Sequence, residues 1–196
     1  MLATASETTK ELPVQITIRP AVPADGRAIS KVYEPYVRDT AITFEEVPPT
    51  GEEMARRITE TLPRHPYLVA ADATGEVIGY AYAGPHAARA SYRWSVSVAI
   101  YLDAKHHGRG VGRRLYERLL PMVAAQGYVM AFAGVTLPNE KSVGIHERFG
   151  FKPVAVYHNV GHKHGRWLDV GWWEKPLTDR LPATPHEPRP WIWTDA

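Results

Sequence analysis

A glycine-rich turn, His107-Gly108-Arg109-Gly110-Val111-Gly112-Arg113, has the residue pattern with the clearest chemical meaning in this sequence. Its alternating glycines leave backbone N–H groups free to converge, with no Cβ to hold a ligand away. The turn follows an apolar run over residues 95–102 and opens an amphipathic run over residues 113–126 that is typical of a helix. N–H groups at a helix start lie at the positive end of the helix dipole. The pattern predicts a phosphate or pyrophosphate site, with a simple flexible turn as the alternative.

Two other phosphate-binding folds are excluded by the surroundings of this turn. A dinucleotide-binding Rossmann fold requires a second βαβ unit and an acidic residue at a strand end roughly 20 residues after the glycines. The sequence has neither. A P-loop nucleotidase requires a Lys-Ser/Thr pair, which the turn lacks.

The composition is that of a globular protein. The 196 residues are 44% hydrophobic and 22% charged, and 23 basic minus 21 acidic side chains give a net charge of +2. This charge is too small to predict nucleic-acid binding. The absence of cysteine excludes disulfides, thiolate metal sites and a cysteine nucleophile. No apolar run approaches the roughly 18 residues needed to cross a membrane, and no secretory segment opens the chain, so a cytoplasmic location is expected.

Hydrophobic periodicity predicts strands interleaved with helices in a single domain. The expected strands are residues 15–19, 67–72, 77–83, 94–102, 129–135, 151–157 and 166–174, with a further short β-like segment at 40–46. One helix is expected from an N-cap at Asp25 to near Pro35 or just beyond, and a second from Thr50 or Gly51. Two more are expected over residues 113–126 and 140–149, the last closed by Gly150.

The domain boundaries follow from the same pattern. Residues 1–13 are expected to be a flexible leader, 14–177 the folded domain, and 178–196 a proline-rich extended tail. Residues 73–76 predict a hairpin turn, and residues 159–165 a polar turn between the last two strands.

Several motifs resemble the GNAT superfamily of acyl-CoA N-acyltransferases. They are the glycine turn, in which His107 stands where Arg or Gln is usual, Asn139-Glu140-Lys141-Ser142, and the segment from His146 to Phe151. Residues 43–45, 66–69, 101–103, 137–139 and 161–170 resemble the phosphinothricin and methionine sulfoximine N-acetyltransferase branch. The resemblance covers roughly residues 15–177. It implies an α/β (α+β) fold, a mixed and mostly antiparallel sheet of about six to seven strands with about four helices, splayed at the acetyl-CoA site.

The resemblance also implies a set of acetyl-CoA-binding residues. Main-chain groups of Ile100, Tyr101 and Leu102 would pair with the pantetheine arm. The turn would hold the pyrophosphate through His107, Gly108, Arg109, Gly110, Val111, Gly112 and Arg113. Asn139 and Ser142 would contact the cofactor arm, and Asn139 could equally be a helix N-cap, with both roles compatible.

Direct acetyl transfer requires a general base, an oxyanion donor and an acid near sulfur. His146 occupies the position where many superfamily members carry a tyrosine, which implies an acid or proton-relay role, with a structural role as the alternative. Ser97 stands where the branch usually places a glutamate, and a serine hydroxyl is not a strong base. Either a water chain ending on Glu45 removes the proton, with Ser97 holding the water, or the amine arrives neutral.

The loop before the longest strand predicts a substrate site. Arg89 or Arg93 could clamp a carboxylate or phosphinate in fork geometry, and Tyr92 and Phe44 could wall the pocket. Solvated surface arginines are the alternative. His158, His162 and His164 are irregularly spaced, so no metal is expected. In the branch, the turn at 159–165 and the strand after it contribute to a dimer, which implies a homodimer.

Three functions stay open at this point. The leading hypothesis is an acetyl-CoA-dependent N-acetyltransferase of a small amino-acid analogue such as phosphinothricin or methionine sulfoximine, with detoxification as the consequence. The second is acetylation of another amine, such as a polyamine, an aminoglycoside-like amine or a protein N-terminus. The third, supported by Ser97, is an acetyl-CoA-binding regulatory module that has lost catalysis.

Overall fold

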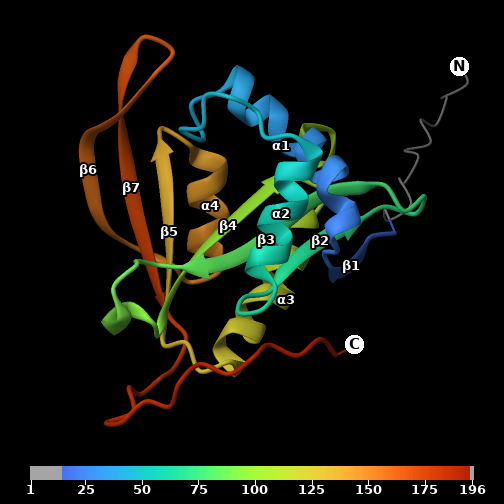
Figure 1. The fold of residues 1–196 in the computed structure, drawn as a ribbon. Helices are drawn as coiled ribbons and strands as arrows, with labels where there is room; N and C mark the ends of the chain where they lie inside the picture. The colour runs from blue at the N-terminus through green and yellow to red at the C-terminus, as the bar shows by residue number, and fades with distance from the viewer. Residues whose placement is uncertain (1–14, 195–196) are drawn as a thin grey trace, which may run out of the picture.

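Seven strands form one mixed sheet in the computed structural model, which describes residues 15–194 (Figure 1). The strand order is β1-β2-β3-β4-β5-β7-β6, and every neighbouring pair is antiparallel except β4 and β5. The strands are β1 (Thr17–Pro20), β2 (Tyr67–Ala71), β3 (Val77–Pro85), β4 (Ser95–Leu102), β5 (Met130–Leu137), β6 (Lys152–Lys163) and β7 (Arg166–Pro176). The α-helices are α1 (Gly26–Asp39), α2 (Gly51–Thr61), α3 (Val111–Ala125) and α4 (Glu140–Arg148). The predicted fold class is thereby confirmed, while the leader predicted at 1–13 lies outside the described residues.

The two faces of the sheet carry separate cores. Along β2 the side chains alternate, so that Tyr67 and Val69 pack under α1 and α2 while Leu68 and Ala70 pack with α3. Every residue of β2 is buried because helices cover both of its faces. This two-sided burial fixes the register of the central strands, and with it the positions of the residues at their ends.

The helix starts show which local signals decided the fold. Helix α2 starts at Gly51, as predicted, and Thr50 caps it, because the Thr50 side chain accepts from the Glu53 N–H at 3.2 Å. Asp25 occupies the N-cap position of α1, as predicted, but its side chain makes no capping hydrogen bond. Its carboxylate accepts from Arg19 and from the Val22 N–H instead, and residues Pro23–Asp25 form a short 3-10 turn before α1.

Helix α1 continues beyond Pro35, as the prediction allowed, and stops at Asp39. The proline removes one helix hydrogen bond, but the following turn buries Val37 in the core, which favours continuing the helix. The Thr40 hydroxyl then donates to the Tyr36 carbonyl at 2.6 Å and closes the last turn. Within residues 15–194, no helix is both long enough and apolar enough to cross a bilayer.

The β-like segment predicted at residues 40–46 is wrong, because this segment is an irregular loop. Its carbonyl groups are satisfied by a side chain rather than by a neighbouring strand. The buried Lys163 ammonium donates to the carbonyls of Val37, Thr43 and Glu45 at 2.7, 2.9 and 2.7 Å. The lysine thus fastens the loop between α1 and α2 to the end of β6.

The polar turn predicted at residues 159–165 is also wrong in extent. β6 continues to Lys163, and only His164 and Gly165, with φ values of 51° and 73°, form the hairpin turn. Asn159 lies in an irregularity of the strand at φ 52°, where the pairing register shifts between Tyr157 and Gly161. β6 is an exposed edge strand, so its polar residues do not show the alternation of apolar and polar side chains by which a half-buried strand is predicted.

The tail after β7 has no helix or strand up to residue 194, and it packs along the lower edge of the domain (Figure 1). Arg189 exchanges backbone and side-chain hydrogen bonds with Gln126, at 2.8 Å each. Trp191 donates to the Leu62 carbonyl at 2.7 Å, and Trp94 donates to the His186 carbonyl at 2.8 Å. These contacts connect the tail to α2, to the end of α3 and to the loop before β4.

Candidate active site

The central strands β4 and β5 form a fork. Their parallel pairing begins with Ser95 opposite Met130 and ends with Ser97 opposite Phe132, after which the strands diverge (Figure 1). β4 continues to Leu102 and β5 to Leu137, and between these stretches no strand pairing occurs within the described residues. The open edge of β4 includes Ile100, Tyr101 and Leu102, where backbone groups can pair with an extended ligand.

The open edge of β4 leads directly into the glycine-rich turn. Gly108 and Gly110 have φ values of 74° and 79°, which other residues rarely adopt, and a Cβ at either would meet nothing within 4 Å. Backbone conformation, not crowding, therefore requires these glycines. Helix α3 begins at Val111, two residues before the predicted start, with Gly110 as an N-cap that offers no side-chain oxygen. The first N–H groups of the helix have no partner inside it and can bind an anion.

Gly112 and His107 hold the turn in place. A Cβ on Gly112 would lie 2.8 Å from Ile145 Cδ1 and 3.2 Å from Ile100 Cδ1, so glycine permits close packing of α3 against α4 and β4. The Tyr36 hydroxyl donates to the Leu102 carbonyl at 2.6 Å and therefore accepts from His107 Nε2 at 3.1 Å. The exposed residues at the tip of the turn are Gly108, Arg109 and Gly110, while Arg113 forms an ion pair with Glu117.

Asn139 begins α4 on the far side of the fork. Its side-chain oxygen accepts from the Ser142 N–H at 3.2 Å, which is the N-cap arrangement that the sequence offered as one of two roles. Its side-chain amide makes no hydrogen bond among the described residues and stays available to a ligand. Asn139 and Ser142 therefore lie where α4 meets the C-terminal end of β5.

His146 lies on α4 and is only 3% exposed. Its Nδ1 donates to the Ser142 carbonyl at 2.6 Å, so its Nε2 accepts from the Tyr116 hydroxyl at 2.9 Å. Burial lowers its pKa below the ordinary value, against a smaller effect of the Ser142 carbonyl, and keeps the imidazole neutral. Because both ring nitrogens are occupied and the ring packs edge-on to Tyr116 and Phe151, this geometry favours a structural role.

Ser97 lies on the opposite face of the sheet, at the last paired position of the fork. That face is open at its centre, since Gly134 of β5 is exposed while Val96 and Val98 on the other face are buried. The Ser97 hydroxyl lies 3.2 Å from Nδ1 of His86, a residue directly after β3 that the sequence patterns did not single out. The fork thus places an imidazole, not a carboxylate, beside Ser97.

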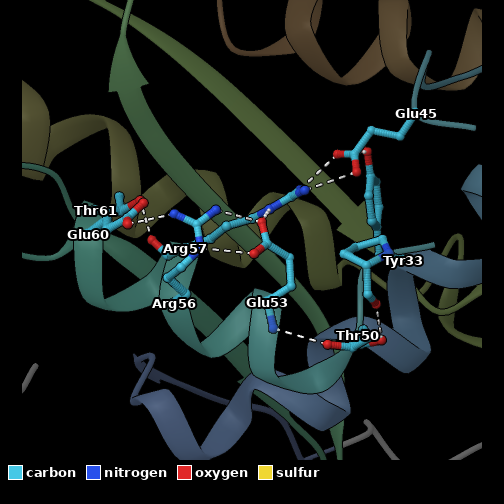
Figure 2. A network of polar contacts seen from close by, with 10 residues as sticks. Tyr33, Glu45, Thr50, Glu53, Arg56, Arg57, Glu60 and Thr61 are labelled. Carbon is cyan, nitrogen blue, oxygen red and sulfur yellow. Dashed lines mark hydrogen bonds and ion pairs between the residues drawn. The ribbon is translucent and has the colours of Figure 1, made fainter. Parts of the chain in front are cut away.

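Glu45 lies in the loop between α1 and α2, and its carboxylate is bound by an arginine (Figure 2). Both of its carboxylate oxygens accept from the Arg57 guanidinium, at 2.8 and 3.0 Å, and the Tyr33 hydroxyl donates to the same carboxylate at 3.1 Å. Arg57 also donates to Glu53, whose pKa is lowered to about 2 by its hydrogen bonds to Arg56 and Arg57. Within the described residues no hydrogen bond joins Glu45, Ser97 and His146, so the predicted catalytic residues are not brought together.

The predicted substrate residues divide into two groups. Phe44 is 39% exposed and lies against Gly161 of β6, where any Cβ would enter its ring. Arg89, Tyr92 and Arg93 instead line a cavity of about 710 Å³ between the β3–β4 loop and the tail. Arg93 is paired with Glu187 and stacked over Trp94, whereas Arg89 is exposed and forms no ion pair within residues 15–194.

The three C-terminal histidines each have a separate partner. His158 pairs with Asp169 at 2.9 Å, His162 packs on Trp167, and His164 donates to the Thr40 carbonyl. No group of three or more metal-binding side chains occurs in the part of the chain that the structure describes.

The sequence patterns did not single out His86 because its position beside Ser97 depends on strand register. Pro85 ends β3 and pairs with Val96, and Gly84 pairs with Ser97, which brings the next residue over the fork. A hairpin register between β3 and β4 would have been the signal, but the loop between them is too long to fix that register locally.

Comparisons with known proteins agree with this geometry. Residues 18–172 match the family model described as an acetyltransferase (GNAT) domain. A phosphinothricin N-acetyltransferase from Streptomyces viridochromogenes is 37% identical over 175 residues, covering 89% of this chain and 94% of that protein. An L-methionine sulfoximine/L-methionine sulfone acetyltransferase from Pseudomonas aeruginosa is 34% identical, covering 79% and 90%.

A solved structure shares the fold over most of its length. The crystal structure of a phosphinothricin acetyltransferase from Sinorhizobium meliloti, in complex with AcCoA, superposes with a TM-score of 0.84 at 36% identity. The match covers 90% of this chain and 95% of that one.

Proposed function

Because the chain belongs to the GNAT acetyltransferase family, we propose that it transfers the acetyl group of acetyl-CoA to the amino group of a small amino-acid analogue. Phosphinothricin, methionine sulfoximine and methionine sulfone are the candidates, because relatives that share 34–37% of their residues with this chain are named for these acceptors. Detoxification of such glutamate mimics would be the consequence.

The observation that carries this proposal is the fork of β4 and β5 leading into the glycine turn. The open edge of β4 after Ser97 offers main-chain groups at Ile100, Tyr101 and Leu102. The turn at Gly108 and Gly110 then leads into the N-terminus of α3. An extended arm ending in a pyrophosphate matches this order of binding groups.

The residues present fit acetyl-CoA. The space beside Gly108 and Gly110 at the exposed tip of the turn is open, and successive backbone N–H groups in such a turn can form an anion-binding concavity. The free amide of Asn139 lies across the fork, near Ser142. When bound, acetyl-CoA supplies the thioester whose acyl group is transferred.

The acceptor would lie on the open face of the sheet, between Phe44 and the β3–β4 loop. The Trp172 indole N–H on this face is buried without a hydrogen-bond partner among residues 15–194, and a substrate oxygen would satisfy it. Arg89 has no ion pair within those residues and could clamp a carboxylate or phosphinate. Tyr92 would wall this side, and Arg93 would first have to leave Glu187.

The three residues predicted to act in catalysis would have different tasks. Ser97 lies at the apex of the fork and would position groups that touch the substrates. Glu45 is bound by Arg57 and would hold the loop that carries Phe44. His146 would support α4 beneath the cofactor arm.

A homodimer in the cytoplasm is the proposed working form. Exposed apolar side chains on the edge strand β6 and at the start of β7 would be covered by a second copy; they are Val154, Val156, Tyr157, Val160 and Trp167, the last 65% exposed. Light scattering after gel filtration would measure the mass. The cytoplasm is proposed because the reaction consumes acetyl-CoA, which must be supplied where the enzyme works.

A thiol-release assay with acetyl-CoA tests the proposed activity. The panel contains phosphinothricin, methionine sulfoximine, methionine sulfone, a set of polyamines, an aminoglycoside and a peptide with a free N-terminus. Turnover on the glutamate mimics is the expected result. Turnover confined to the other amines would show that the acceptor is one of those amines and not a glutamate mimic. Acetyl-CoA binding without any turnover would point to a regulatory module.

A further inference from the structure

His86 lies over the apex of the fork with its ring held on three sides. The imidazole stacks on Phe132 of β5 at 4.1 Å between ring centroids, with an interplanar angle of 23°. Trp172 meets it edge-on at 5.8 Å and Tyr92 at 6.2 Å. These contacts orient the ring and leave it half-buried, between the β3–β4 loop and the open face of the sheet.

We propose that His86 is the general base that accepts the proton of the acceptor amine, and that Ser97 is its positioning residue. This inference rests on the proposed acetyl transfer. It assigns the base to a side chain from the loop beside the fork, since the Ser97 hydroxyl is not itself a strong base.

The hydrogen bond between His86 and Ser97 selects the required tautomer. Nδ1 of the imidazole lies 3.2 Å from the Ser97 hydroxyl oxygen. When Nδ1–H donates to this oxygen, the lone pair of Nε2 is free to accept a proton. Nε2 has no hydrogen-bond partner among the described residues, so it is available to an ammonium group on the open face.

The surroundings of His86 keep the imidazole neutral. Burial lowers its pKa below the ordinary value of 6.5. Two titratable residues belong to the elements packed against it: Tyr92, whose ring meets the imidazole edge-on, and Glu174, which pairs in register with Phe132. Neither forms a hydrogen bond with the ring, so the neutral base is the form present near pH 7.

The other candidate bases are already occupied. Glu45 accepts two hydrogen bonds from Arg57 and one from Tyr33. His146 uses both ring nitrogens within the core. Of these three candidates, His86 alone contacts Ser97 and keeps a basic nitrogen without a hydrogen-bond partner among the described residues.

A single histidine is enough to account for both protons that leave the acceptor nitrogen. The acceptor arrives as an ammonium ion and gives one proton to Nε2 of His86. The amine nitrogen then forms a bond to the acetyl carbonyl carbon, the carbon–sulfur bond breaks, and the second nitrogen proton goes to the sulfur as CoA thiol. His86 releases its proton to water, so each turnover yields one amide, one thiol and one proton.

The first test is the pH dependence of the His86→Gln variant with the best acceptor from the panel. The expected kcat/KM is lower than that of the wild type by roughly 10²–10⁴-fold, as for loss of a general base. The acidic limb of the profile, which in the wild type falls below the pKa of His86, should disappear. The KM for acetyl-CoA and the thermal unfolding midpoint should stay close to wild type. His158→Gln, which removes an exposed histidine on β6, is the matched control and should keep the acidic limb.

Two further variants separate the chemical role from a packing role. Ser97→Glu in the His86→Gln background introduces a carboxylate at the fork and should recover activity at least tenfold over His86→Gln alone. His86→Ala should be rescued by added imidazole, because the space over Phe132 can admit the free base. A variant that is merely misfolded would show neither recovery.

A wild-type pH profile and rate in His86→Gln would overturn the assignment of the base and leave the acetyltransferase function intact. Loss of activity without any change in the acidic limb, and without rescue by imidazole or by Ser97→Glu, would also overturn it. If the wild type itself turns over no amine in the panel, the proposed function and this inference fail together.

Discussion

The guanidinium of Arg57 donates to both carboxylate oxygens of Glu45, at 2.8 and 3.0 Å (Figure 2). This forked pair connects α2 to the loop that carries Phe44. Lys163 fastens the same loop to β6 through the carbonyls of Thr43 and Glu45. The proposed acceptor site is therefore walled by a loop with no regular secondary structure, which side-chain contacts hold in place.

Arg57→Lys should weaken acceptor binding and leave cofactor binding nearly unchanged. Lysine cannot reproduce the fork, and a bond worth about 1 kcal/mol corresponds to roughly a fivefold change in affinity. We expect the KM for the acceptor to rise by about this factor while the KM for acetyl-CoA stays the same. Arg56→Lys is the matched control, since among the described residues Arg56 pairs only with Glu53 and Glu60 on its own helix. Equal effects of the two variants would contradict the assigned role.

The carboxyl of Asp25 should make the fold sensitive to acid. Its burial alone would raise its pKa, but the bonds from Arg19 and the Val22 N–H outweigh this and lower the pKa below the ordinary 3.8. A lowered pKa means that the unfolded chain binds the proton more tightly. The contribution is therefore complete above pH 3.8 and is lost as the pH falls through the folded-state value.

Urea unfolding between about pH 5 and pH 2 measures this contribution. The free energy of unfolding of the wild type should fall more steeply below pH 3.8 than that of Asp25→Asn, which has no carboxyl to protonate at this position. Parallel curves for the two proteins would show that the Arg19 contact contributes nothing to acid stability.

Gly110→Ala should impair acetyl-CoA binding through the backbone. Gly110 has φ 79°, and an added Cβ would meet nothing within 4 Å, so the cost is conformational. A left-handed conformation costs an alanine roughly 1–2 kcal/mol, which predicts a rise of about tenfold in the dissociation constant for acetyl-CoA. Gly110→Asn should lose less, because asparagine tolerates this conformation. Calorimetric titration with acetyl-CoA measures both, and equal losses would exclude the conformational explanation.

Local sequence signals predicted the parts of the site that depend on local structure. The glycines at 108 and 110 adopt the positive φ values for which glycine is needed, and Thr50 caps α2. Asn139 likewise caps α4. Each of these features is decided within about four residues, which is the range over which a sequence pattern acts directly.

Long-range contacts determined the parts that sequence reasoning missed. Residues 40–46 resemble a strand, but Lys163, more than a hundred residues later, supplies their hydrogen bonds. His86 meets Ser97 only because β3 and β4 pair in one register and β5 joins at the same position. Asp25 holds the N-cap position of α1, but its carboxylate binds Arg19 instead of capping the helix. Such contacts require the sheet to be assembled first.

The last prediction concerns the tail, which ties the loop bearing His86 to the rest of the domain. Trp191 donates to the Leu62 carbonyl at 2.7 Å, while Trp94 donates to the His186 carbonyl at 2.8 Å. Trp191→Phe keeps an aromatic side chain but removes the indole N–H and its hydrogen bond, and it should lower the free energy of unfolding by about 1 kcal/mol. Leu181→Ala, at a tail position that is 68% exposed, is the control and should have no measurable effect.

Deleting residues 185–196 should have a second effect that Trp191→Phe lacks. The deletion also removes Glu187, which pairs with Arg93, and the His186 carbonyl, which accepts from Trp94. Arg93 and Trp94 follow His86 in the same loop. The orientation of the imidazole over Phe132 should then be less well defined. We therefore expect kcat to fall with the deletion and not with Trp191→Phe, at a temperature where both variants are folded by circular dichroism. Equal kcat values in the two variants would show that the tail stabilises the domain without positioning the base.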